Sequence, residues 1–292
     1  MTDKVELVLD AKATLGEGPV WDWKKQLLFW VDIEGCNLYS YNPSNEKQQT
    51  WTFNEMIGAA APTASGEMLL ALESGLANFN FDRRKLTWHF VLENNDTSMR
   101  YNDGEIGPNG NFWIGSMHKK IHSQSGNLYR VTPDFQTTIQ IPKTTISNGF
   151  AWTSDLEKFY FIDSPTHQIC SYDFDSVHSD ITNKQIAIKV PEDCGAPDGM
   201  CIDSEDMLWI AHWGGGCVRR WNPKTGKVLD QIDIPAPHVT SCCFGGEDLK
   251  TLYITTARSG LTNEQLEKYP LSGGLFKFSP GVSGKQITYF KD

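Results

Sequence analysis

The chain has 292 residues, 39% of them apolar and 12% aromatic, and carries a net charge of −10. It contains no run of about 18 apolar residues that would cross a membrane and no row of lysines or arginines long enough to follow a nucleic-acid backbone. We therefore expect no membrane and no nucleic acid as partner, and one domain over residues 1–292.

Six short aromatic-rich runs follow one another along the chain, and each ends in small or acidic residues. They cover residues 28–32, 68–71, 112–115, 159–163, 208–211 and 252–255, about 40 to 49 residues apart. A period near 45 residues without helical periodicity is typical of a β-propeller that has one four-stranded antiparallel blade per repeat. Six repeats predict an all-β, six-bladed β-propeller, whose loops gather around one central channel.

A second stretch follows the aromatic run in several repeats, alternating apolar and polar residues and ending in a turn. In chain order, such stretches cover residues 37–43, 126–133, 217–226 and 274–280. This alternation is typical of half-buried antiparallel strands, and the Asn-Pro and Lys-Thr-Gly sequences supply turns. Only residues 263–268 have the pattern of a short helix, which we expect on the surface.

Four polar segments, each containing glycine, precede four of the aromatic runs by about 10 to 13 residues. They are Leu-Gly-Glu-Gly-Pro-Val-Trp (15–21), Arg-Tyr-Asn-Asp-Gly (100–104), Ile-Ser-Asn-Gly (146–149) and Ala-Pro-Asp-Gly-Met (196–200). Their spacing predicts equivalent inner positions in the first, third, fourth and fifth repeats. We expect them in inter-strand loops, from which side chains can face the channel.

Three of these segments contribute oxygen donors, namely Glu17, Asn148 and Asp198. Two carboxylates and an amide carbonyl suit a hard divalent cation such as Ca²⁺, Mg²⁺ or Mn²⁺. Zinc usually recruits histidine or cysteine, although oxygen-rich zinc sites exist. A purely structural interpretation stays open, because Asx-Gly pairs form turns and Glu-Gly-Pro can end a strand. The recurrence of different oxygen-bearing side chains at one repeat position argues against that interpretation.

Seven short motifs occur in a fixed order along the chain. They cover residues 16–21, 100–104, 147–149, 197–203, 240–246, 256–258 and 273–276. In this order and spacing, the chain resembles the senescence marker protein/regucalcin/gluconolactonase family of six-bladed propellers, essentially from end to end. The resemblance implies a metal-dependent lactonase that opens a pentono- or hexonolactone to the aldonic acid. Its partner would be the small sugar lactone, and its cofactor one divalent cation, Ca²⁺, Mg²⁺, Mn²⁺ or Zn²⁺.

The resemblance also implies roles for particular residues. By position, Glu17, Asn148 and Asp198 match the family's metal ligands, and Arg100 and Asn102 match its substrate-contacting residues. Beside a cation that polarises the lactone carbonyl, Asp198 could act as the catalytic residue that takes a proton from water. Arg100 offers a rigid fork of donors for substrate oxygens, and an asparagine both donates to and accepts from a hydroxyl.

One position departs from the vertebrate members of this family, which carry an acidic pair where this chain has Lys119 and Lys120. Lys120 lies where a family glutamate contacts the substrate. We consider two interpretations, in which Lys120 either hydrogen-bonds a sugar hydroxyl or points to solvent. If it reaches the pocket, sugar preference should change, because a lysine donates to a hydroxyl but cannot accept from one.

Three further patterns give weaker indications of function. His118 and His122 are four residues apart but lack the glutamate of a zinc-protease helix. His212 is expected to pack in the core or at the channel rim. No Gly-x-Ser-x-Gly elbow occurs, which disfavours a serine hydrolase.

The seven cysteines form no CxxC pair, and Cys242 and Cys243 are adjacent. This pattern predicts buried free thiols in a reducing compartment. Residues 1–6 do not begin a secretory signal. Together these features predict a cytoplasmic protein, as a monomer or a small homo-oligomer.

Two functions other than a lactonase stay open from the sequence. A non-catalytic calcium-binding regulator would bind the metal and leave lactones unhydrolysed. A propeller used as a protein-interaction scaffold would need no convergent set of Glu17, Asn148 and Asp198, and would show exposed apolar patches.

Overall fold

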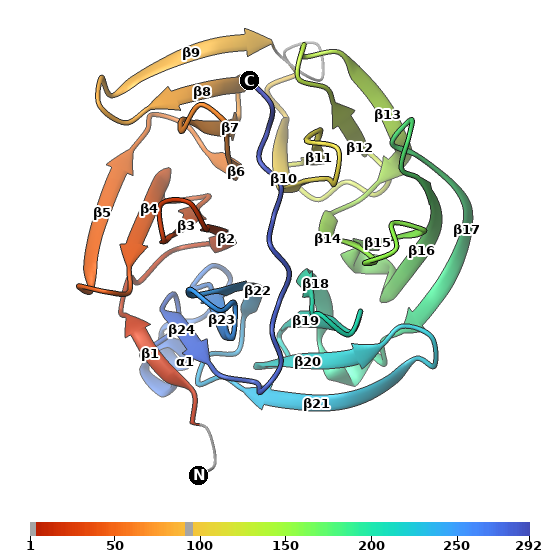
Figure 1. Ribbon diagram of the computed structural model, residues 1–292. Helices are drawn as coiled ribbons and strands as arrows, with labels where there is room; N and C mark the ends of the chain where they lie inside the picture. The colour runs from red at the N-terminus through yellow and green to blue at the C-terminus, as the bar shows by residue number, and fades with distance from the viewer. Residues whose placement is uncertain (1–3, 91–95) are drawn as a thin grey trace.

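The computed structural model describes residues 4–90 and 96–292, and over these residues the chain forms six four-stranded antiparallel sheets. The sheets stand as blades around a central channel (Figure 1). The predicted all-β, six-bladed propeller is therefore confirmed.

In each blade the strands occupy four positions from the channel outward. The innermost strands are β2 (Gly16–Asp22), β6 (Ile57–Pro62), β10 (Met99–Ile106), β14 (Ser147–Trp152), β18 (Ala196–Ile202) and β22 (Val239–Gly245). The second strands are β3 (Leu27–Asp32), β7 (Met68–Leu72), β11 (Phe112–His118), β15 (Lys158–Asp163), β19 (Leu208–Trp213) and β23 (Thr251–Thr256). The third strands are β4 (Asn37–Asn42), β8 (Gly75–Asn80), β12 (Gly126–Val131), β16 (Gln168–Asp175), β20 (Cys217–Asn222) and β24 (Leu275–Phe278). The outermost strands are β5 (Lys47–Thr52), β9 (Lys85–Phe90), β13 (Thr137–Thr144), β17 (Asp180–Lys189), β21 (Lys227–Asp233) and β1 (Glu6–Leu9).

The ring is closed by pairing the two ends of the chain. The strand β1 pairs with β24 through Glu6–Lys277 and Leu7–Phe276, so the last blade takes its outermost strand from the start of the sequence. All blades share one strand order, so the six innermost strands run in the same direction along the channel. We call the end where they begin the upper end, and the end where they finish the lower end.

The aromatic-rich runs form the second strands, which are buried between neighbouring blades. Trp30, Trp113 and Trp209 are at most 1% exposed. Because both faces of these strands are covered, their sequences are continuously apolar instead of alternating. The acidic residue at the end of two runs fixes the segment that leads into the innermost strand of the same blade. Asp32 accepts hydrogen bonds from the backbone nitrogens of residues 14 and 15, and also from that of residue 35 in the next turn. Asp163 accepts from those of residues 145 and 146.

The predicted short helix is confirmed as α1 (Asn263–Lys268). A capping box starts it, in which the Thr262 and Gln265 side chains each bond the other's backbone nitrogen. Two 3₁₀ turns, η2 (Ser164–Thr166) and η3 (Glu192–Cys194), follow β15 and β17. No helix in the described part of the chain is long and apolar enough to cross a membrane.

After β24, the chain crosses the lower end of the channel and finishes beside the second blade (Figure 1). We call residues 279–292 the C-terminal strap. Gly284 donates to the carbonyl of Leu249 at 2.8 Å, and Phe290, which is fully buried, donates to that of Pro62 at 3.0 Å. The strap is thus attached to the ring on both sides of the channel.

Candidate metal and substrate site

The four polar segments lie on innermost strands, not in the inter-strand loops that the sequence suggested. They begin β2, β10, β14 and β18, in the first, third, fourth and fifth blades, at the upper end of the channel. In all four strands the pairing with the second strand shifts register at this segment, next to Glu17, Asn102, Asn148 and Asp198. A β-bulge leaves residues out of the ladder and re-aims their side chains.

Glycine makes two of these bulges possible. Gly18 and Gly149 have φ values of +50° and +46°, in the left-handed region that side chains disfavour. Gly199 lies so close to the neighbouring blade that an added Cβ would stand 2.2 Å from the Ser241 hydroxyl. The glycines in these segments thus allow the backbone conformation and the close packing between blades. The adjacent polar side chains are the ones available to face the channel.

A line of hydrogen bonds joins the third and fourth blades at this site. Arg100 Nη1 donates to Asn102 Oδ1 at 2.8 Å, and Asn102 Nδ2 donates to Asn148 Oδ1 at 3.0 Å. Asn148 Nδ2 in turn donates to the Ser164 hydroxyl at 2.8 Å. The Asn148 amide is therefore held with its oxygen facing Asn102 and its nitrogen facing away. The residues 102 and 148 meet although they are 46 positions apart in the sequence.

Asp103 is the site residue to which the sequence patterns assigned no role. It is buried, and its carboxylate accepts hydrogen bonds at 2.8 Å from the backbone nitrogens of Gly104 and Gly149. It thereby ties the bulge of β10 to the bulge of β14. The sequence did contain a feature that could have pointed to Asp103. It lies between Asn102 and a glycine, in one of the four polar segments.

The carboxylates at this end of the channel influence one another strongly. Burial, and next the charge of Asp103, raise the pKa of Glu17 to about 8. Burial, followed by Glu17 and Asp103, raises the pKa of Asp198 well above its ordinary value. Burial also raises the pKa of Asp103 to about 6. Three buried acids that oppose one another's ionisation create a demand for positive charge.

Arg100 supplies part of that positive charge. Burial lowers the pKa of Arg100, and the charges of Glu17 and Asp198 counteract this effect. Within the described chain, only Nη1 of the guanidinium donates hydrogen bonds, to Asn102 and to the Tyr101 carbonyl. The remaining donors of the fork are left for another partner.

The donor set fits a divalent cation. In residues 4–90 and 96–292, no three His, Cys, Asp or Glu side chains form a metal site by themselves. At the upper end of the channel, however, Asn148 adds an amide oxygen to the carboxylates of Glu17 and Asp198, and all three side chains are at most 6% exposed. Oxygen donors of this kind bind Ca²⁺, Mg²⁺ or Mn²⁺. A cation would offset the burial and the mutual repulsion that raise the pKa values of both carboxylates.

The other predicted positions lie outside this group. Lys120 is exposed in the turn after β11, and its ammonium makes no hydrogen bond or ion pair with the described residues. The neighbouring Lys119 pairs with Glu73. His118 and His122 stack with ring centroids 3.7 Å apart. His212 is fully buried and accepts a hydrogen bond from Trp221 Nε1, which agrees with the core packing expected for it.

The raised pKa values predict how the stability of the metal-free protein depends on pH. Glu17 and Asp198 have higher pKa values folded than unfolded, so between those values the folded state holds more protons. The free energy of unfolding should therefore fall as pH rises from about 5 to about 8 in EDTA. Saturating Ca²⁺ should reduce this slope, because the cation replaces the protons. Urea unfolding with and without Ca²⁺ measures both slopes, and equal slopes would contradict the prediction.

The sequence is similar to a known family. Residues 15–258 match the sequence profile described as "SMP-30/Gluconolactonase/LRE-like region". Regucalcin of Xenopus laevis is 34% identical over 293 residues, which cover 98% of each chain. A Bacillus subtilis (strain 168) protein named "Putative sugar lactone lactonase YvrE" is 33% identical over 284 residues, covering 97% of each chain.

A solved crystal structure has a fold similar to that of this chain. The crystal structure of regucalcin from Agrobacterium tumefaciens, described as a calcium-binding protein, superposes with a TM-score of 0.94 at 25% sequence identity. The superposition covers 98% of this chain and 97% of that chain. The likeness thus extends over essentially the whole propeller.

Proposed function

This chain belongs to the SMP-30/gluconolactonase/LRE-like family, and on that basis we propose that it hydrolyses a sugar aldonolactone with the help of one divalent cation. The product is the open-chain aldonic acid, and a pentono- or hexonolactone is the proposed substrate. The observation that carries the proposal is the convergence of Glu17, Asn148 and Asp198 from three blades, beside Arg100.

Glu17, Asn148 and Asp198 are the proposed ligands of the cation. When bound there, a divalent cation would polarise the lactone carbonyl and stabilise negative charge on its oxygen. Asn102 and Ser164 support this assignment, because they orient the Asn148 amide from both sides. Asp103 supports it too, by holding the backbone of the β14 bulge through Gly149.

Asp198 is the proposed acceptor of the proton from the attacking water. Its carboxylate lies on the innermost strand, where burial excludes bulk water from competing for the proton. A positioned carboxylate that takes a proton in the transition state typically contributes about 10²- to 10⁴-fold to a rate. Asp198 returns that proton to the ring oxygen as the carbon–oxygen bond of the ring breaks. The carboxylic acid that forms then loses its own proton to solvent.

Arg100 and Asn102 are proposed to contact the substrate. The unused donors of the Arg100 fork can bind lactone oxygens, and the negative field of Glu17 and Asp198 keeps the guanidinium charged despite burial. Asn102 has a second task in this arrangement, because its amide nitrogen donates to Asn148. A change at Asn102 therefore acts on the ligand set as well as on the substrate.

Lys120 is proposed to influence which sugar is preferred. Its exposed place at the end of β11 leaves its ammonium able to reach a hydroxyl at the upper end of the channel. Replacing it by glutamate changes a donor into an acceptor, so the ranking of epimeric lactones should change while metal content does not. An unaltered ranking would show that Lys120 faces solvent throughout the reaction.

A lactone panel tests the proposed function. With Ca²⁺, Mg²⁺, Mn²⁺ or Zn²⁺ added back after chelation, the protein should release acid from at least one aldonolactone, as measured with a pH indicator. EDTA should return the rate to the uncatalysed background. The second candidate, a calcium-binding regulator, is favoured by the description of the Agrobacterium relative. It would bind the metal and leave every lactone at the background rate.

We also propose a cytosolic location and a monomer or small homo-oligomer. All seven cysteines are free thiols, which suits a reducing compartment.

A further inference from the structure

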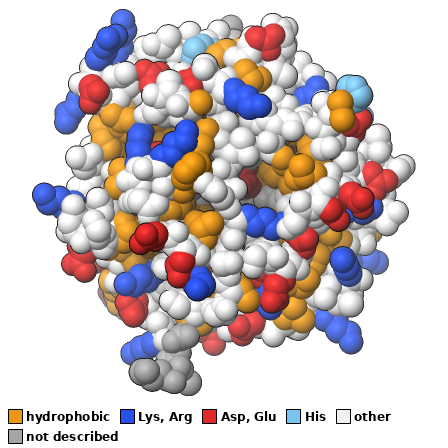
Figure 2. Space-filling model, in the orientation of Figure 1, with side chains coloured by type: hydrophobic (Ala, Val, Ile, Leu, Met, Phe, Trp, Pro, Cys, Tyr) orange, Lys and Arg blue, Asp and Glu red, His pale blue; other side chains and the backbone are white. Residues whose placement is uncertain are grey.

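A second recess lies at the lower end of the channel, on the opposite face from the candidate site. It has a volume of about 300 Å³ and is lined by the middle and final residues of the innermost strands and by the C-terminal strap. Figure 2, which looks at this lower face, shows it hollowed near the centre, with a basic side chain at the edge of the hollow. The volume is at the small end of the range for small-molecule sites.

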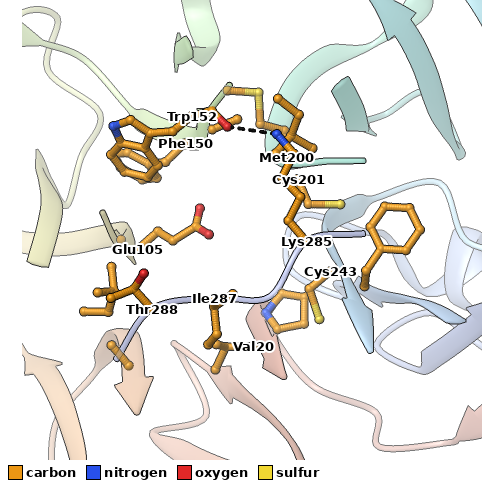
Figure 3. A pocket seen from close by; sticks show the side chains of 18 of the residues that line it. Val20, Glu105, Phe150, Trp152, Met200, Cys201, Cys243, Lys285, Ile287 and Thr288 are labelled. Carbon is orange, nitrogen blue, oxygen red and sulfur yellow. Dashed lines mark hydrogen bonds between the residues drawn. The ribbon is translucent and has the colours of Figure 1, made fainter. Parts of the chain in front are cut away.

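The wall of this lower recess is mostly apolar. Phe150, Trp152, Met200, Cys201 and Ile287 surround it from two blades and from the strap (Figure 3). Burial raises the pKa values of the Cys201 and Cys243 thiols well above 9, so these two thiols are uncharged near neutral pH. These side chains suit the apolar body of a small molecule.

One carboxyl group points into this apolar space. The Glu105 side chain projects from β10 toward the middle of the recess (Figure 3). It makes no hydrogen bond or ion pair with any residue the structure describes, and the surface it retains faces the recess. Burial, and next the charge of Asp103, raise its pKa to about 8. Glu105 is only partly exposed, and a largely buried carboxyl without a partner is costly to the fold and rare without a reason.

The basic residue that lines the recess does not neutralise Glu105. Lys285 of the strap also lines the recess, but its ammonium donates to the Trp152 carbonyl at 3.3 Å and pairs with Asp206. Lys285 therefore closes one side of the opening and is held there by its own partners. Among the described residues that line the recess, Glu105 is the acid left without a partner, amid aromatic and sulfur-bearing side chains.

We propose that the lower recess binds a small organic cation, a primary amine with a compact apolar or aromatic body. The ammonium pairs with Glu105, and the body packs against Phe150, Trp152 and Met200. An ammonium beside a buried carboxylate and aromatic rings combines an ion pair with apolar contact. The net charge of −10 also favours a cation over an anion.

This recess opens at the other end of the channel from the proposed lactonase site. Its inner end reaches Gly18 and Asp103, next to that site, but the proposed metal ligands and Arg100 do not line it. Val20, Trp152 and Ile202 of the recess lie near or at the ends of their strands. The proposal therefore stands whether or not the protein hydrolyses lactones.

Benzylamine is a suitable probe, with benzyl alcohol as its neutral counterpart of similar shape. Isothermal titration calorimetry on the full chain should show one benzylamine per protein, and at least about tenfold weaker binding of benzyl alcohol. Glu105→Gln should weaken benzylamine about 10- to 100-fold and leave benzyl alcohol affected far less. Glu105→Asp, which withdraws the carboxylate by one methylene, should give an intermediate loss.

The matched control is Glu157→Gln, an exposed glutamate in the turn after β14 that contributes Ser154 and Leu156 to the recess. It removes the same charge from the same end of the channel, so it should leave benzylamine binding within about twofold. Thermal melting of each variant confirms that it is folded. Glu105→Gln removes a partly buried acid that has no partner among the described residues, so it should not lower the melting temperature of the protein.

Binding should also release protons. Near pH 7, Glu105 is mostly protonated, so an incoming ammonium must displace up to one proton to the buffer. The measured heat should therefore vary with the ionisation enthalpy of the buffer, and the affinity should rise with pH until about pH 8. Among the groups that face Glu105, Asp103 has a pKa of about 6, and Cys201 and Cys243 stay neutral, so the release is assigned to Glu105.

Three results would overturn the proposal. Equal binding of benzylamine and benzyl alcohol would show an apolar pocket without charge recognition. Unchanged benzylamine affinity in a folded Glu105→Gln variant would place the ammonium elsewhere. No detectable heat with benzylamine at millimolar concentration, in the folded wild-type protein, would mean that the recess holds only water.

Discussion

Asp198→Ala is expected to remove the divalent cation and to lower lactone hydrolysis by at least about 100- to 1,000-fold, the loss typical of removing one group that stabilises the developing oxyanion. Asp198 is both a proposed ligand and the proposed proton acceptor. Its loss also leaves Glu17 and Asn148 as only two donors from the chain, too few to hold a hard cation firmly. Metal analysis and kcat measured on the same preparation give both quantities.

The stability of this variant distinguishes a lost ligand from a damaged fold. In Ca²⁺, its melting temperature should fall modestly, because the bound cation no longer stabilises the folded state. In EDTA, it should not fall, because burial and the charges of Glu17 and Asp103 already oppose ionisation of Asp198. Asp230→Ala, on the outermost strand of the same blade, is the control and should keep metal and activity. A fully active Asp198→Ala variant would contradict the assignment.

Arg100→Ala is expected to lower kcat/KM by about 10- to 100-fold, the effect of losing a charge-assisted contact. Metal content should stay at the wild-type level, because Arg100 is positive and its removal makes the site more attractive to a cation. Arg100→Lys keeps the charge but loses the planar fork, so it should recover only part of the activity. Parallel loss of metal and activity would instead make Arg100 part of the metal site.

Comparing Asn102→Ala with Arg100→Ala separates substrate contact from support of the metal ligand Asn148. It should lower turnover as Arg100→Ala does, but it should also weaken metal binding, because Asn102 holds the oxygen of Asn148 in place. Titrating Ca²⁺ into both variants shows the difference directly. Identical calcium affinities would mean that the Asn102–Asn148 hydrogen bond does not orient a ligand.

The repeat pattern was sufficient to predict the propeller from the sequence. The second strand of each blade is buried on both faces, so its apolar run is local and recurs once per blade. Helix α1 was also predictable, because its capping residues lie within four positions of one another. Structural features that depend only on residues close together in the sequence can be predicted from the sequence.

The candidate site was predictable in part, for the same reason. Glu17, Asn148 and Asp198 each stand beside a glycine that shapes a bulge, and this local pairing recurs at the repeat period. The sequence alone suggested loops where these bulges lie, because the register of a strand is set by its partner. Lys120 stays a prediction, since its side chain makes no contact within the described chain that would decide its direction.

By itself, then, the sequence determined the fold class, the number of blades and the oxygen-bearing side chains at equivalent repeat positions. Only the tertiary structure decided which side chains touch across blades: the bond from Asn102 to Asn148, the contact of Asp103 with Gly149, and the enclosure of Glu105. It also decided the path of the C-terminal strap, which meets the first and second blades through residues 287–292. These contacts join residues from 46 to 267 positions apart. They exist because ring closure brings the innermost strands together, a constraint that no local pattern encodes.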